Sequence, residues 1–123
     1  MRSTAAALLD LCCVVVFVVI GRASHHKGED VAGIASTLWP FLSGAVLGWL
    51  ISRAWRSPGV LVPAGVTVWL ATVVVGMVLR VVAGQGIAFA FVLVALAFLG
   101  LFMLGWRVVA RALPRARRLR LER

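Results

Sequence analysis

The stretch GVTVWLATVVVGMVLRVVAGQG, residues 65–86, decides the fold class. Fifteen residues without a charge precede a single cation, Arg80. A helix needs about 20 mainly apolar residues, at ~1.5 Å each, to cross the hydrocarbon core of a bilayer. The segment therefore has the length and composition of a membrane-spanning helix.

The rest of the chain has the same character. Of its 123 residues 63% are hydrophobic, and the mean hydropathy is +1.05. A soluble domain this short has too little interior to bury so much apolar surface. We predict an all-α, integral membrane four-helix bundle with spans at about 4–20, 31–52, 59–80 and 87–106. These spans form a membrane domain, 1–106, and a basic tail follows at 107–123.

The basic residues predict how the chain sits in the membrane. With four spans, both termini and the middle connector share one side, which carries ten basic residues: Arg2, Arg53, Arg56 and the seven arginines of 107–123. The other side carries three: Arg22, Lys27 and Arg80. Cytoplasmic loops are enriched in Lys and Arg, so we expect both termini in the cytoplasm and a multi-pass protein of the cell (plasma) membrane.

The first span also resembles a signal peptide, because Arg2 precedes a hydrophobic run. The following residues GRASHHK offer no clean cleavage site, and Asp10 interrupts the apolar region. We therefore favour a retained span.

Asp10 is the only acid within an apolar span. It lies roughly 9 Å into the helix, counted from Thr4. Intramembrane acids often bind protons or ions. Alternatively, the helix N-terminus and a nearby Arg53 or Arg107 stabilise the carboxylate without any transport role. The sequence leaves both interpretations open.

The third span can accommodate Arg80 without a special partner for its charge. Eleven Val or Leu residues between Val60 and Leu79 favour insertion by about −3 to −7 kcal/mol. An arginine costs about 2.5 to 3.5 kcal/mol at the bilayer centre and less at an interface, where we expect Arg80 to reach water. A polar cluster with Arg22, Glu29 and Asp30 is the less favoured alternative.

Small residues recur at every fourth position of the second span: Ser36, Pro40, Gly44, Gly48 and Ser52. Such stripes allow close helix contacts, which we expect to lie within one subunit rather than between subunits. Pro40 should kink the helix, since it offers no N–H to the carbonyl of Ser36.

Other patterns mark the ends of the helices. The Ser-Pro-Gly at 57–59 predicts a helix cap followed by proline at the first helical position. The Gly-Gln-Gly at 84–86 predicts a tight turn that joins the last two spans. Trp49, Trp55 and Trp106 fall where indole rings anchor helices at an interface.

We expect no metal site and no cofactor. His25, His26, Glu29 and Asp30 could bind a divalent cation weakly, but Lys27 would repel it. The adjacent Cys12 and Cys13 suit neither a disulfide nor a metal site. The basic tail favours binding to anionic lipid headgroups, and nucleic-acid binding is not expected because no aromatic residue or fold signature accompanies the charge.

Several strings resemble, in order, a family of small bacterial membrane proteins known as domain of unknown function 3054: IGRASH, WPFLSGAVLGWL, the 65–86 stretch and LGWR. The resemblance reaches to Arg107 and implies a four-helix membrane protein without implying an activity. It points to recurrent positions of unassigned role: Asp10, Arg22, His25, Trp39, Pro40, Gly44, Trp69, Arg80, Gly84, Gly86, Trp106 and Arg107.

Three function classes follow. The first is a structural, regulatory or accessory membrane protein that acts through helix contacts, in a homo-oligomer or with a membrane protein partner. The second is a small transporter or channel that uses Asp10. The third, an enzyme, is not expected, since the sequence groups no nucleophile with a base and an orienting residue.

Overall fold

The computed structural model describes residues 3–24, 31–85 and 89–121, with side chains as far as Leu113. The regular elements in these residues are all helical: α1 (Ser3–Ser24), α2 (Val31–Ser52), the short π-helical segment η1 (Leu61–Gly65), α3 (Val66–Val82) and α4 (Phe89–Leu121). The prediction of an all-α chain with four membrane-compatible helices is confirmed, because four segments are long and apolar enough to cross a bilayer. They are Ser3–Arg22, Val31–Ser52, Leu61–Val82 and Phe89–Leu113.

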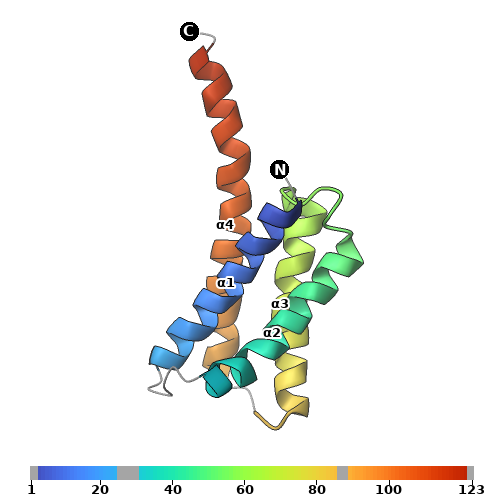
Figure 1. The fold of residues 1–123 in the computed structure, drawn as a ribbon, viewed down its shortest axis with the longest axis vertical. Helices are drawn as coiled ribbons and strands as arrows, with labels where there is room; N and C mark the ends of the chain where they lie inside the picture. The colour runs from blue at the N-terminus through green and yellow to red at the C-terminus, as the bar shows by residue number, and fades with distance from the viewer. Residues whose placement is uncertain (1–2, 25–30, 86–88, 122–123) are drawn as a thin grey trace.

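The four helices form an antiparallel bundle in chain order. Each helix packs against its neighbours in the chain, and α4 packs against α1 to close the ring. Figure 1 shows the start of α1 at the same end as the connector between α2 and α3, beyond which α4 projects from the bundle. A hydrogen bond from Ser3 Oγ to the carbonyl of Trp55, 2.8 Å, fastens that end.

Aromatic and aliphatic side chains fill the centre of the bundle. Phe17 of α1 meets Phe41 of α2 edge-on, with ring centroids 5.3 Å apart, and also contacts Phe91 and Phe98 of α4. Outside, large apolar side chains are bare: Phe89 is 79% exposed and Leu101 69%. Such a surface is stable when lipid rather than water covers it.

Two small residues of α2, Gly44 and Gly48, face α3 of the same chain. A Cβ on Gly44 would lie 2.7 Å from the carbonyl oxygen of Ala71, and one on Gly48 would lie 2.7 Å from Cα of Val68. No side chain fits in either space, so the glycines let the two helix backbones approach closely.

The helix ends differ from the expected ones in two places. The helical segment before α3 begins at Leu61, and 57–59 forms a turn: Ser57 N–H donates to the carbonyl of Ala54, while Val60 N–H donates to that of Ser57. Ser57 is therefore not the expected cap. Helix α4 continues through 106 and 107, because no helix breaker stands at that boundary.

The turn after α3 follows the expected chemistry as far as it is described. Gly84 has φ +77°, a conformation that side chains with a Cβ rarely adopt. Gly86 and the loop with His25 lie outside the described residues.

Candidate functional site

A buried ion pair joins the first and last helices of the bundle. The side chain of Asp10, in α1, is 2% exposed, and that of Arg107, in α4, is fully buried. Arg107 donates from one terminal nitrogen to Oδ1 of Asp10 at 2.9 Å and from the other to Oδ2 at 2.7 Å. This is the two-pronged geometry in which guanidinium and carboxylate bind most strongly.

Two indole groups complete the shell around the carboxylate. Trp49 Nε1, from α2, donates to Oδ2 of Asp10 at 2.8 Å. Trp106 Nε1, from α4, donates to Oδ1 at 2.9 Å. Each oxygen thus accepts two hydrogen bonds, which replaces most of the hydration that the carboxylate loses on burial.

The guanidinium of Arg107 also binds backbone. Its Nε donates to the carbonyl of Pro58 in the α2–α3 connector at 2.9 Å, and one terminal nitrogen donates to the carbonyl of Met103 at 2.9 Å. Gly65 makes room for this arginine, since a Cβ there would lie 2.8 Å from its Cδ. We refer to Asp10, Trp49, Pro58, Trp106 and Arg107 as the ion-pair cluster.

The cluster connects every part of the bundle at one end. Asp10 comes from α1, Trp49 from α2, Pro58 from the connector that leads to α3, and the other two residues from α4. A buried pair adds little net stability over apolar residues, but a single partner left behind is costly. The cluster therefore favours one relative arrangement of the helices.

Only part of this arrangement was predicted. Arg107 was one of two arginines offered as a partner for Asp10, and the structure pairs it rather than Arg53. Trp49 and Trp106 were expected to be interfacial anchors, yet both donate to Asp10. Pro58 was expected at the first position of a helix, not as a hydrogen-bond acceptor for Arg107. A buried carboxylate needs donors, so counting residues from the helix ends could have placed the two indoles at its depth.

A second polar group lies at the opposite end of the bundle. Arg80, expected to reach water, is only 9% exposed. Its guanidinium donates to Oε1 of Gln85 at 3.1 Å and lies 4.7 Å from the ring centroid of Phe91. The ring and the side-chain amide take the place of water around the cation.

Gln85 also supplies a hydrogen bond that Pro40 removes from α2. Proline lacks an N–H, so the carbonyl of Ser36 loses its usual partner four residues later. Gln85 Nε2 donates to that carbonyl at 2.9 Å. We refer to Ser36, Pro40, Arg80 and Gln85 as the glutamine bridge.

The other candidate residues lie apart from both groups. Arg22 donates to Oγ1 of Thr37 at 2.9 Å, joining α1 to α2. Trp69 Nε1 donates to the carbonyl of Leu96 at 3.0 Å, and Trp39 is 42% exposed on the outside of the bundle. Within the described part of the chain, no three His, Cys, Asp or Glu side chains gather as metal ligands do.

Comparison with known proteins places the chain among relatives. The model of a family described as protein of unknown function (DUF3054) matches residues 7–110. The chain belongs to this family. No curated protein and no solved structure matches the chain.

The match covers both structural groups of this DUF3054 protein. Asp10 and Arg107 both lie inside the matched residues, as do Arg80 and Gln85. The match ends before Arg111, so the last part of α4 lies beyond it.

Proposed function

We propose that this multi-pass membrane protein has a structural, regulatory or accessory role and acts through helix–helix contacts, either in a homo-oligomer or with another membrane protein. Under this proposal it is neither an enzyme nor a protein that binds a cofactor. Its place is the cell membrane.

The ion-pair cluster carries the proposal. The polar atoms inside the bundle are engaged with one another, and no buried side-chain nitrogen or oxygen among the described residues lacks a hydrogen-bond partner. A catalytic or transport site requires groups that can bind a substrate or change their proton content. Here Asp10 is held by Arg107 and two indoles, an arrangement suited to fixing helices.

The fixed bundle would present a defined apolar surface to its partner. In lipid, association depends on close packing and on few polar contacts, so a rigid helix arrangement favours a specific fit. Capture of the tagged chain after crosslinking in its native membrane should recover a second copy or one partner in constant ratio. Recovery of the monomer alone under these conditions would contradict the proposal.

We further propose that both ends of the chain lie in the cytoplasm. The ten-to-three distribution of basic residues supports this orientation. A periplasmic-reporter phosphatase fused after Arg123 should be inactive, and the same enzyme fused after Gln85 should be active. The reverse pattern would overturn the orientation.

A small transporter that uses Asp10 is the second candidate. The observation in its favour is the burial of an acid within an apolar helix, a position common for proton-coupling residues. Reconstituted vesicles distinguish the two roles: proton flux that Asp10→Asn abolishes, while the variant keeps the helical spectrum of the wild type, would support transport. Equal proton leak in vesicles with and without the protein would support the accessory role.

A further inference from the structure

Two open depressions line the same side of α4 and differ in chemistry. The first, with a volume of about 590 Å³, is bordered by the connector residues 56–60 and by Ala110 and Arg111 of α4. The second, about 400 Å³, is apolar and lies between α3 and α4, with Trp69, Leu104 and Val108 in its wall. We refer to them as the arginine groove and the apolar groove.

The grooves follow one another along the same face of α4. Gly100, Leu104, Val108 and Arg111 succeed each other at steps of three or four residues, so their side chains line one stripe of the helix. The apolar groove lies along residues 96–108 of α4. The arginine groove follows it at Ala110 and Arg111, near the end of the apolar segment at Leu113.

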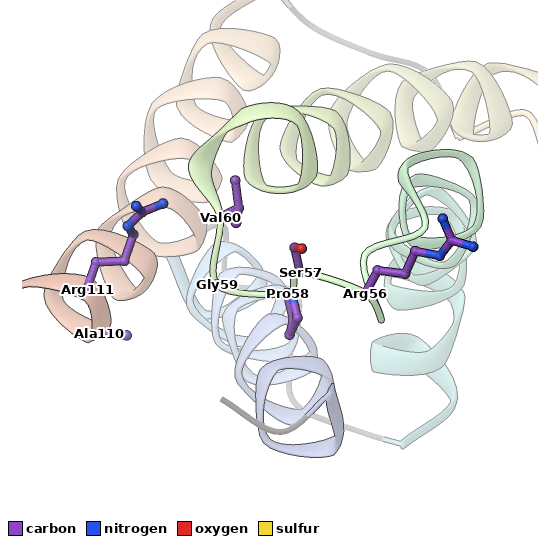
Figure 2. A pocket seen from close by; sticks show the side chains of 7 residues that line it. All are labelled: Arg56, Ser57, Pro58, Gly59, Val60, Ala110 and Arg111. Atoms are coloured by element: carbon purple, nitrogen blue, oxygen red, sulfur yellow. The ribbon is translucent and has the colours of Figure 1, made fainter. Parts of the chain in front are cut away.

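The arginine groove lies at the depth of lipid headgroups. Arg111 stands two residues before Leu113, the last residue of the apolar segment of α4, and Arg56 lies in the connector between the segments that end at Ser52 and begin at Leu61. Figure 2 shows the two guanidinium groups on opposite sides of Ser57, Pro58 and Gly59. Both side chains are exposed, and no hydrogen bond or ion pair within the described residues engages either of them.

We propose that the two grooves together bind one anionic glycerophospholipid, with its phosphate at Arg111 and an acyl chain along the apolar groove. Charge complementarity favours an anionic headgroup, because the lining residues include two cations and no acid. The apolar groove next to the cations requires a ligand that carries a hydrocarbon chain below its phosphate, which a glycerophospholipid supplies. Arg56 adds positive potential at the far rim.

This inference goes beyond the proposed accessory role and does not depend on it. It requires only that the helices span a bilayer. It also differs from general attraction between the basic tail and anionic lipid, since it assigns a lipid to two described arginines and a groove.

The test is native mass spectrometry of the full chain in detergent, titrated with phosphatidylglycerol or phosphatidylcholine of the same acyl length. The wild type should retain one phosphatidylglycerol with clear preference over phosphatidylcholine. Arg56→Gln/Arg111→Gln should lower the affinity for phosphatidylglycerol about tenfold or more, and Arg111→Gln should account for most of that loss. The matched control Arg53→Gln removes the same single charge as Arg111→Gln at a described position that lines neither groove, and it should bind nearly as the wild type does.

A second pair of variants tests the acyl chain. Gly105 borders the apolar groove, and a Cβ there meets nothing within 4 Å, so Gly105→Leu should fill the groove without disturbing the fold. It should reduce retention of phosphatidylglycerol, whereas Gly21→Leu, at a similarly open position on α1, should not. Circular dichroism and thermal melting establish that each variant is folded.

Three results would overturn the proposal. Equal binding of the two lipids by the wild type would exclude a preference for a net anionic headgroup, because phosphatidylcholine carries the same phosphate together with a compensating cation. If the groove variant and the charge-matched control lost equal affinity for phosphatidylglycerol, net charge alone would explain the effect. If inorganic phosphate raised the melting temperature of the protein as much as phosphatidylglycerol does, the site would bind soluble anions instead of a lipid.

Discussion

Asp10 and Arg107 stand 97 positions apart in the chain and share two hydrogen bonds of 2.7 and 2.9 Å inside the bundle. The pair joins the first helix to the last, so it forms only when these two helices pack against each other. Its position between two indole donors and a connector carbonyl means that either residue alone would be left with unmatched charge.

Removing one member of this pair should destabilise the protein strongly. Arg107→Met and Asp10→Asn should each lower the free energy of unfolding by about 3–5 kcal/mol, because a buried charge loses its partner. The loss of unfolding free energy in the double variant should be clearly smaller than the sum of the losses in the two single variants. Unfolding in detergent micelles, followed by circular dichroism, measures all three.

Arg111→Met is the matched control for that experiment. It removes an exposed arginine from the next turn of α4, and its effect should stay within about 0.5 kcal/mol. Strictly additive losses in the double variant would show that the two residues are not coupled.

Each of the two indole donors should contribute separately to the stability of the protein. Trp49→Phe and Trp106→Phe keep an aromatic ring but remove one hydrogen bond each to the carboxylate, at a cost of about 1.5–3 kcal/mol. Trp39→Phe, on the exposed side of α2, should have little effect on the same melting curves. If Trp39→Phe proved as costly as the other two, ring packing rather than hydrogen bonding would explain the losses.

The contact between α2 and α3 should not tolerate a methyl group. Gly44→Ala should lower stability by about 1–3 kcal/mol, because the added Cβ would lie 2.7 Å from the carbonyl oxygen of Ala71. Gly21→Ala is the control, since a Cβ there meets nothing within 4 Å and alanine favours the helix. Equal melting temperatures of the two variants would mean that the helices are not packed this closely.

Gln85 and Pro40 should be energetically coupled. Gln85→Ala leaves the carbonyl of Ser36 without a donor and should cost about 1 kcal/mol in the presence of Pro40. Pro40→Ala restores a backbone N–H to that carbonyl, so the same change at Gln85 should cost less in this background. The four proteins form a cycle whose coupling energy can be measured by unfolding. A coupling energy of zero would show that Gln85 acts only through Arg80.

The helices themselves were predictable from local composition. The segment 31–52 was placed at its observed ends, and the other three spans overlap the observed helices. An apolar run of about 20 residues needs a bilayer whatever its neighbours are, so each span could be recognised alone. The spacing of small residues at every fourth position likewise predicted the close helix contact at Gly44 and Gly48.

Tertiary contacts decided the surroundings of two arginines at the ends of spans. Arg107 was placed in the tail because it follows the last apolar residues, yet it is buried in the ion-pair cluster. Arg80 was expected to reach water, yet Gln85 and Phe91 surround it. In both cases the sequence showed an arginine at the end of a span, and only the packed neighbours determined whether it met water.

The sequence by itself determined that this DUF3054 protein is helical and has four membrane-compatible spans. It also showed that most basic residues lie at the two termini and in the middle connector. These features could be recognised because hydrophobicity and charge are properties of each segment alone. The tertiary structure decided that Asp10 meets Arg107, Trp49 and Trp106, and that Gln85 serves the carbonyl freed by Pro40. Hydrogen bonds depend on direction and on distances of about 3 Å, and these are fixed only when the helices pack against one another.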